Sequence, residues 1–498
     1  MRNDFATGEA PQVLYSHQEH ALNLLRKSLR NGKRRPMLAA PVGFGKTLCA
    51  ANLLKSAQMK GNRSIFVVDA ISLIDQTVKA FYRAGLYSLG VIQADHPMTD
   101  PTKEIQIASV QTLQRRKIPD ADLILNDEAH GQHSFFLDLI SGGAWSEKPV
   151  IGLSATPWSK GLGRHYDDLI KPISMQELVD TINPATGRPY LSPFKCFAPI
   201  PPDLSKVRIQ DGDYVESDLS EVMCEEGLVA DAVNTWIKHA YGIPTLIFAV
   251  DRAHAKKLQR EFDESGIPCG YIDCFTDAGE RRRIKEQLDN RDIFAVASVG
   301  TMIKGVDWAF GCISDNAPTR SHIRHVQKWG RGMRVNEGIG DLIVLDHAGN
   351  TLRLGFPTDI DRDRMCEKAP KDKRDASEAS TKATPTECPK CHYLKPAKVH
   401  ECPQCGFKPQ KISSVEVREG ELEELRHRRE VERVFLGELK GYAELKGKSD
   451  SWWMAKFKAR FHHFPAMASA PLKPSPETIK WLTSQNIRWA KGKGKKAA

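Results

Sequence analysis

The 498-residue chain lacks the long apolar segments of a membrane protein, since no run in it approaches the roughly 18 consecutive apolar residues that a spanning helix needs. Residues 1–11 also lack the basic and then apolar layout of a secretion signal. These two absences predict a cytoplasmic protein without a membrane partner.

The chain also lacks the pattern of cysteines that marks a disulfide framework. Of its 11 cysteines, four fall in two Cys-x-x-Cys pairs and the others are scattered singly. We therefore expect reduced thiols and one metal site.

Acidic residues are scarce in one region only. Lys and Arg outnumber Asp and Glu by 72 to 62, and residues 451–498 hold ten basic residues against a single acid, Glu477. This asymmetry predicts a basic tail that binds a polyanion, with nucleic acid favoured over an anionic membrane surface. The length and an apolar content of 41% predict about three domains with buried cores.

Short runs rich in Val, Ile and Leu alternate with segments of helical length in two series, which is typical of buried parallel strands with crossover helices. The runs of the first series lie at 36–40, 65–68, 105–109, 123–125 and 150–154. Those of the second lie at 245–250, 269–272, 293–297 and 342–346, with helices expected at 253–265, 279–290 and 321–330. The fold class predicted is α/β, with two parallel-sheet domains in tandem.

Changes in composition divide the chain into six expected parts. A polar segment with almost no large apolar residues is expected to be a flexible linker. The parts are a first α/β domain (1–170), a connector and hinge with short irregular elements (171–227), a second α/β domain (228–356), the linker (357–387), a metal-binding ribbon (388–410) and a helical, basic C-terminal region (411–498).

The sharpest motif, AAPVGFGKT, begins at the end of the first run. Glycines such as Gly43 and Gly45 let backbone N–H groups close around a chain of phosphates. Lys46 would neutralise phosphate oxygens, and the Thr47 hydroxyl is a Mg²⁺ ligand. The motif predicts a nucleoside triphosphate site, although Ala40 stands where the pattern has its first glycine.

An acidic pair, Asp127 and Glu128, follows the run at 123–125. Ligands of open α/β sheets bind at the carboxyl ends of the strands. We expect Asp127 to hold Mg²⁺, directly or through water, and Glu128 to orient and deprotonate the attacking water. Two exposed carboxylates in a turn are the alternative, which the phosphate loop upstream disfavours.

Gln327, Arg331 and Arg334 recur at i, i+4 and i+7, the spacing of one helical face. Guanidiniums suit triphosphate oxygens, and an arginine from a second domain stabilises the transition state only when the cleft between the domains closes. We therefore expect these three residues to act in hydrolysis. A solvated basic face is the alternative.

Two short knuckles, Cys388-Pro-Lys-Cys391 and Cys402-Pro-Gln-Cys405, are separated by ten residues. Their four thiolates complete a closed tetrahedral shell, which predicts a structural Zn²⁺ site. Disulfide pairing is the alternative. Basic residues around the knuckles suit nucleic acid, and a protein partner fits equally well.

Aromatic residues interleave with the basic residues of the tail, as in single-strand-binding surfaces. The alternative is a small helical subdomain with an aromatic core, above all for the pair Phe457 and Phe461. Residues 492–496 are expected to form a disordered polybasic end. The aromatic residues are Trp452, Trp453, Phe457, Phe461, Phe464, Trp481 and Trp489.

At these motifs the chain resembles the superfamily 2 helicases and translocases of the DEAH/DExH type, over most of residues 14–350. The resemblance implies two RecA-like domains with Mg²⁺-ATP between them. It implies that Gln18 reads the adenine, and that the segment 297–307 belongs to a motif in which Gly305 and Asp307 serve the nucleotide site.

The resemblance also implies residues that couple hydrolysis to strand movement and residues that grip nucleic acid. The coupling residues would be His130, Ser154, Ala155 and Thr156. The gripping residues would be Ser72, Thr77, Thr112 and Thr301, which could equally be helix caps or turn residues.

The function predicted is an ATP-dependent DNA helicase or translocase that uses ATP, Mg²⁺ and Zn²⁺ and acts on single-stranded or forked DNA. Compact proteins with this layout are familiar among phage-type helicases and restriction motors. An RNA helicase, a restriction motor subunit and an ATP-gated nucleic-acid-binding module remain alternatives. A protein partner could bind the zinc ribbon or the tail.

Overall fold

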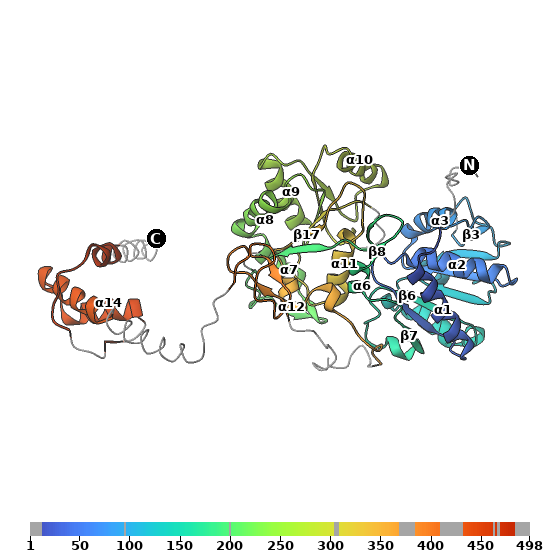
Figure 1. Cartoon of the computed structure of the whole chain (residues 1–498), viewed down its shortest axis with the longest axis horizontal. Coiled ribbons are helices and arrows are strands. Elements are labelled where there is room, and N and C mark those ends of the chain that lie inside the picture. Colours follow the sequence, from blue (N-terminus) through green and yellow to red (C-terminus); the bar gives the residue numbers. More distant parts are fainter. Residues whose placement is uncertain are drawn as a thin grey trace. The chain divides into compact units, whose positions relative to one another are not determined.

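The computed structural model forms two compact units, Met1–Phe407 and Lys408–Ala498. The first unit contains two large sheets flanked by helices, and the second is helical (Figure 1). The residues described are 12–93, 96–198, 201–302, 308–367, 384–408, 432–461, 464–465 and 469–483.

The first sheet has seven parallel strands in the order β3-β4-β2-β5-β6-β1-β7. Its central strands are buried throughout, as their Val, Ile and Leu content predicts. The strands are β1 (Pro36–Ala39), β2 (Ser64–Val68), β3 (Leu89–Val91), β4 (Ile105–Ser109), β5 (Leu123–Asn126), β6 (Val150–Ser154) and β7 (Asp168–Ile170).

Crossover helices connect these strands. In α3, for example, Ile74, Val78 and Phe81 recur at helical spacing and are buried against the sheet. The helices are α1 (Ser16–Arg30), α2 (Lys46–Gln58), α3 (Ile74–Arg83), α4 (Val110–Arg115) and α5 (Ser134–Ser141), with 3-10 turns η1 (Ile71–Leu73), η2 (Ala129–Gly131), η3 (Gly143–Trp145) and η4 (Leu162–Arg164).

The segment after β7 is more regular than its Pro and Gly content suggests. Its strand β10 pairs in parallel with β17 and so forms one edge of the second sheet. The elements of this segment are α6 (Met175–Asp180), β8 (Ile182–Asn183), β9 (Arg188–Pro189), β10 (Phe194–Phe197), β11 (Ile209–Gln210), β12 (Asp213–Tyr214) and α7 (Glu216–Met223).

The second sheet has six parallel strands in the order β10-β17-β16-β13-β15-β14. The prediction of two tandem parallel-sheet domains is thus confirmed. The strands of the second sheet besides β10 are β13 (Thr245–Phe248), β14 (Cys269–Ile272), β15 (Ala295–Ser298), β16 (Cys312–Asp315) and β17 (Leu342–Asp346). Its helices are α8 (Glu226–His239), α9 (Arg252–Glu264), α10 (Ala278–Asp289), α11 (His322–Gly332) and α12 (Asn350–Leu354), followed by η5 (Pro357–Asp359).

A buried ion pair fixes α11 on the second sheet. Lys328 Nζ donates to Asp315 Oδ1 at 2.7 Å and to Ala317 O at 2.6 Å, and neither charged side chain is more than 4% exposed. Asn350 of α12 donates to the other Asp315 oxygen at 2.8 Å. Losing one partner of such a pair costs about 3–5 kcal/mol, so α11 has a firmly set position.

The second unit has its own aromatic core. Residues 432–445 and 476–483 are helical on either side of α14 (Asp450–Phe461). Phe457 is fully buried there, with Trp452, Trp453, Phe461 and Trp481 packed around the same core. These five aromatics therefore belong to the core that the sequence left as an alternative.

Phe464, a further aromatic residue of the tail, lies outside that core. Phe464 is 56% exposed, with Lys458 Nζ 4.4 Å from the centre of its ring. Trp489 and the basic segment 492–496 lie outside the described residues.

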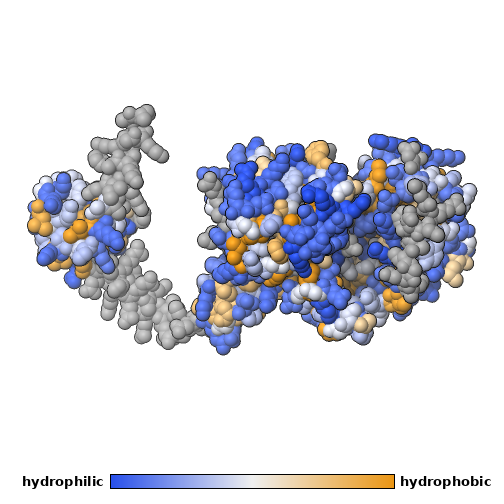
Figure 2. Space-filling model, turned by 90° about the horizontal axis from the view of Figure 1, so that it is seen from above, coloured by the Kyte–Doolittle hydropathy of each residue, from blue (hydrophilic) through white to orange (hydrophobic). Residues whose placement is uncertain are grey.

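No helix in the described part of the chain is long and apolar enough to cross a membrane. The face seen in Figure 2 is largely hydrophilic, with apolar residues in small groups.

Candidate functional site

The predicted phosphate loop connects β1 to α2 and depends on two glycines. Gly43 and Gly45 have φ of 77° and 89°, in the left-handed region. A Cβ on Gly43 would lie 2.5 Å from Leu191 Cδ2, and a Cβ on Gly45 would collide with the Gln18 amide. The loop therefore needs glycine for both its backbone conformation and its space, and it leads into the N–H groups of the first turn of α2.

Gln18 braces this loop from α1. Its side chain is 2% exposed, its Nε2 donates to Phe44 O at 2.7 Å, and its Oε1 accepts from Tyr15 N at 2.9 Å. Gln18 thus fixes the loop backbone, and reading of adenine by this residue stays a prediction.

Four aromatic rings, those of Tyr15, His17, Phe44 and Tyr190, gather beside Gln18. The His17 ring lies 4.5 Å from that of Tyr190 and 5.1 Å from that of Phe44, centre to centre. Burial lowers the pKa of His17, which favours its neutral form. Such faces suit stacking on a purine. No sequence signal pointed to Tyr190, because it comes from the segment between the domains.

The acidic pair lies where β5 ends, facing the phosphate loop. Glu128 Oε1 is 3.7 Å from Lys46 Nζ, which comes from the first turn of α2. Glu128 has φ of 48°, a left-handed conformation that costs a non-glycine residue about 1–3 kcal/mol and is commonest at functional sites.

Asp127 fits a divalent cation. Its Oδ1 is buried without a hydrogen-bond partner among the described residues. Burial and, next, the negative charge of Glu128 raise the pKa of Asp127 to about 7. A cation would offset both effects, and carboxylate and hydroxyl oxygens are the ligands that Mg²⁺ prefers, so Asp127 and Thr47 suit this ion.

His130 connects the acidic pair with the second domain. Gln327 Nε2, on α11, lies 3.1 Å from His130 Nε2, and His130 Nδ1 lies 2.9 Å from Ser154 Oγ. Because the Gln327 amide donates, His130 Nε2 must accept and the ring proton lies on Nδ1. His130 Nδ1 is also 3.2 Å from Glu128 Oε2.

The chain of contacts continues beyond β6. Ser154 Oγ accepts from Thr156 N at 3.0 Å, and Thr156 Oγ1 is buried without a hydrogen-bond partner in the described residues. Ala155, between them, is half-buried. The predicted coupling residues thus form one connected group with Gln327, and their role in coupling stays a prediction.

The helix α11 lies directly against the phosphate loop. A Cβ on Gly330 would be 2.6 Å from Val42 Cβ, which leaves no space for any side chain at this position. Arg331 is in the last turn of α11 and is half-buried. The second domain therefore touches the loop expected to hold the triphosphate.

The prediction that Gln327, Arg331 and Arg334 share one helical face is wrong for Arg334. The helix ends at Gly332, which packs against Leu342, and Arg334 pairs with Leu191 in an antiparallel bridge. Arg334 still comes near the loop, because Leu191 also contacts Gly43. Gly305 and Asp307 lie outside the described residues.

The four predicted nucleic-acid contacts divide into two groups. Ser72 and Thr301 line a cleft of 1870 Å³ between the two sheets. Thr77 Oγ1 instead donates to Leu73 O at 2.8 Å, and the Thr112 hydroxyl lies 2.9 Å from Ser109 Oγ, the N-cap of α4. The last two have the structural partners that the sequence left as an alternative.

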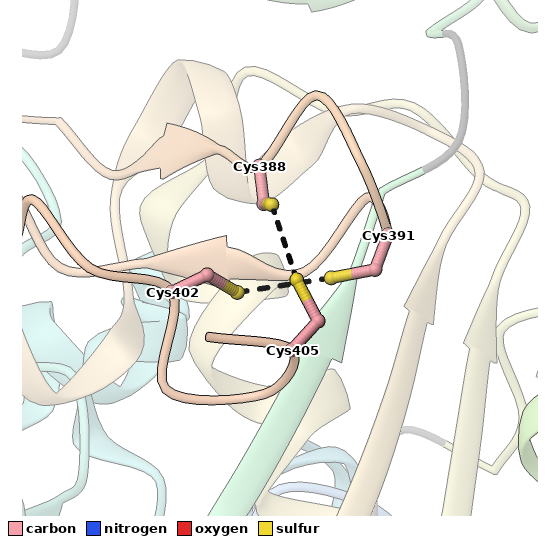
Figure 3. Close-up of side chains that lie close together, drawn as sticks. All are labelled: Cys388, Cys391, Cys402 and Cys405. Carbon is pink, nitrogen blue, oxygen red and sulfur yellow. Dashed lines mark hydrogen bonds between the residues drawn. The ribbon is translucent and has the colours of Figure 1, made fainter. Parts of the chain in front are cut away.

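The four cysteines of the two knuckles converge on one point (Figure 3). The Sγ atoms of Cys388 and Cys405 are 3.8 Å apart, and those of Cys391 and Cys402 are 3.7 Å apart. A tetrahedron with Zn–S bonds of about 2.3 Å has edges of about 3.8 Å, so the site fits Zn²⁺. No disulfide links them.

The zinc-binding hairpin joins the edge of the second sheet. Its strands are β18 (Thr386–Glu387) and β19 (Leu394–Lys395). Tyr393 forms an antiparallel bridge with Phe197 of β10, and Ala198 N donates to His392 O at 3.1 Å. Leu394 is buried in the core of the first unit. The ribbon is thus part of that unit.

The chain is similar to several known proteins. Residues 12–159 match the family described as the res subunit of type III restriction enzymes. A 51.5 kDa protein of a Lactococcus phage is 25% identical over 483 residues, which cover 92% of this chain and 100% of that protein. The candidate ATP-dependent helicase IRC3 of Saccharomyces cerevisiae is 27% identical over 364 residues, 68% of this chain and 52% of the yeast protein. The chain thus spans about half the length of that relative.

Solved structures show the same fold. A fragment of a candidate HsdR subunit of a type I restriction enzyme from Vibrio vulnificus aligns with 72% of this chain and 68% of its own, with a TM-score of 0.52 and 18% identity. The type ISP restriction-modification enzyme LlaBIII aligns with 68% of this chain and 28% of its own, with a TM-score of 0.52 and 16% identity. The resemblance to superfamily 2 helicases and translocases, and its link to restriction motors, is confirmed. These similarities support a helicase-like ATPase as the class of enzyme to be tested.

Proposed function

We propose that the chain is a DNA-dependent ATPase that couples hydrolysis of Mg²⁺-ATP to movement along DNA or to its unwinding. One observation carries this proposal: α11 of the second domain packs on the phosphate loop of the first, and its Gln327 contacts His130. Whatever occupies the loop must therefore act on the second domain too.

The residues of the site have separable roles in this proposal. The N–H groups of the phosphate loop and Lys46 bind phosphate oxygens, while Thr47 and Asp127 hold Mg²⁺. When bound, Mg²⁺ supplies positive charge against the phosphate oxygens. Glu128 accepts the proton of the attacking water, and its contact with Lys46 places the carboxylate beside the loop. Arg331 stabilises the charge that develops on the phosphates.

Coupling would run through His130. Its Nε2 accepts from Gln327 and its Nδ1 lies near both Glu128 and Ser154, so a shift of α11 changes the surroundings of the catalytic carboxylate. The contact is a hydrogen bond of ordinary length between two domains, which closure can form and reopening can break.

DNA is the track that we propose. The cleft between the sheets is lined by the predicted contacts Ser72 and Thr301 and by basic side chains. The similar enzyme LlaBIII was solved bound to DNA. RNA as the track is an outcome that the test below distinguishes.

The test is steady-state ATP hydrolysis by the full chain without nucleic acid and with single-stranded DNA, duplex DNA or RNA. We expect DNA to stimulate the wild type, and Glu128→Gln to lose at least about 100-fold in kcat because it removes the general base. The matched control is Glu264→Gln, at an exposed glutamate that ends α9, which should behave as the wild type.

Two results would refute the proposal. One is hydrolysis by the wild type that no nucleic acid changes, and the other is stimulated hydrolysis that survives in Glu128→Gln. Stimulation by RNA alone would keep the motor and change its track. Stimulated hydrolysis without strand displacement on a forked duplex would limit the function to translocation or clamping.

A further inference from the structure

The cleft between the two sheets has an uneven charge distribution. Six of its lining residues are basic: Lys79, Arg83, Arg281, Lys285, Arg324 and Lys328, the last of which is neutralised by its buried ion pair with Asp315. Four are acidic, and three of these four come from one short segment, residues 211–216. A cleft that suits a polyanion thus contains an acidic element of its own chain.

That element is the hairpin of β11 and β12, which precedes α7. Its turn residues Asp211 and Gly212 have φ of 51° and 85°, as a tight two-residue hairpin turn requires. Tyr214 packs the hairpin onto the second domain beside Val250, whereas Ile209 is 53% exposed. The base of the hairpin is therefore anchored and its outer strand is open to solvent.

The carboxylate of Asp213 contacts three donor groups of the second domain, which we call the seat. Its Oδ1 accepts from Arg320 N at 2.7 Å and its Oδ2 accepts from Thr319 Oγ1 at 2.6 Å. The Arg324 guanidinium lies 3.6 Å from Oδ2. These three groups thus contact one carboxylate.

The donors are held in place without Asp213. Thr319 is 2% exposed, its N donates to Asn350 Oδ1 at 2.8 Å, and its Oγ1 also accepts from Ser321 N at 3.1 Å. Arg324 projects from the first turn of α11, and its side chain is 65% exposed. The seat is thus built into the start of α11, whose opposite end touches the phosphate loop.

We propose that Thr319, the Arg320 amide and Arg324 form a binding site for a backbone phosphate of DNA, which the Asp213 carboxylate occupies until DNA replaces it. Hydroxyls, backbone N–H groups and guanidiniums are the usual donors to DNA phosphates, and carboxylate and phosphate oxygens accept the same bonds. DNA then enters this part of the cleft only by displacing the Asp213 carboxylate. This inference rests on the proposed function.

The test is binding of a fluorescently labelled oligothymidylate to the full chain, followed by anisotropy at several NaCl concentrations. Asp213→Asn keeps an acceptor for Arg320 N but removes the competing charge, so the Kd should fall about tenfold. Asp211→Asn is the matched control: it removes the same charge from the same hairpin, away from the seat, and Asn tolerates a left-handed φ. Its effect should stay within about twofold, as expected for an exposed charge.

Arg324→Gln gives a second, independent measurement. It should weaken binding, make the slope of log K against log salt shallower by about 0.7, the value for one phosphate of a single strand, and cancel the gain of Asp213→Asn in the double variant. If Arg324 served only to pin the hairpin, its loss would free the hairpin without weakening the binding of DNA.

Several outcomes would overturn the inference. One such outcome is that Asp213→Asn and Asp211→Asn have equal Kd values. Another is that both variants bind the oligothymidylate more tightly than the wild type does. If a lowered melting temperature shows that Asp213→Asn is unfolded, Arg324→Gln decides, and a wild-type Kd and salt slope there would overturn the site. If the wild type binds DNA and substitution of Asp213 or Arg324 does not change this binding, only this inference is refuted. If the wild type does not bind DNA, the proposed function is refuted as well.

Discussion

Gly330→Ala tests whether close contact of α11 with the phosphate loop matters for hydrolysis. The added methyl group would lie 2.6 Å from Val42 Cβ and Cγ2 and 2.7 Å from Cγ1. Carbon atoms in contact need about 3.5–4.0 Å, so helix and loop must separate by about 1 Å. A misplacement of this size at a catalytic site can lower the rate about 100-fold, and we expect kcat to fall by about 10- to 100-fold.

The assay is DNA-stimulated ATP hydrolysis, with kcat and KM measured separately. We expect the KM for ATP to change little, because Lys46 and the loop glycines remain in place. Gly340→Ala is the control, since a Cβ there meets nothing within 4 Å. Val42→Gly removes all three clashing atoms and should restore part of the lost rate in the double variant with Gly330→Ala.

The reasoning is refuted if Gly330→Ala keeps the wild-type kcat with an unchanged melting temperature. A loss of kcat accompanied by a large fall in melting temperature, with no rescue by Val42→Gly, would show instead that the close packing serves stability alone.

Three further predictions concern other parts of the first unit. Gln327→Leu breaks the hydrogen bond to His130 and should lower the DNA-stimulated kcat about tenfold, or about 1.4 kcal/mol, in steady-state kinetics; an unchanged rate would count against coupling through this bond. Cys402→Ser should abolish stoichiometric zinc in elemental analysis and lower the melting temperature, and retention of full zinc would contradict the Cys₄ assignment. Burial lowers the pKa of His325 to about 4. Between about pH 6.5 and 4, the unfolded chain therefore binds a proton that the folded chain excludes. The free energy of unfolding should thus fall as the pH falls, by about 2 kcal/mol at pH 5. Urea unfolding at pH 7.5 and 5 should show a smaller fall for His325→Gln, and an equal fall would refute this origin.

The strands that the sequence predicted and those that it missed differ in length and polarity. Runs rich in Val, Ile and Leu gave β4 and β6 with their observed bounds, because strands buried on both faces are rich in these residues. The strands β3 and β7 have three residues each, too short for a pattern to emerge. The strand β16 ends in Ser314 and Asp315, whose burial depends on partners that only the tertiary structure supplies, such as Lys328 for Asp315.

The residues of the candidate site also divide into those that the sequence predicted and those that it missed. Phosphate-loop residues and the zinc ligands could be placed from sequence, because each set is confined to a short contiguous segment or a pair of them. Contacts supplied by the segment between the domains could not, since Tyr190, Leu191 and Asp213 carry no motif and matter only through what they touch. Arg334 was misplaced because a helical spacing says nothing about where the helix ends.

The position of the zinc hairpin has a consequence for the fate of the chain when metal is scarce. An exposed edge strand presents unpaired N–H and C=O groups that can recruit another chain. The strand β10 is such an edge, and the hairpin covers its end through Phe197 and Tyr393. Without its ion the hairpin loses the bonds that hold its two knuckles together, and β10 becomes open to other copies. Zinc depletion should therefore lead to self-association through β10, and bound zinc would protect the chain from aggregation.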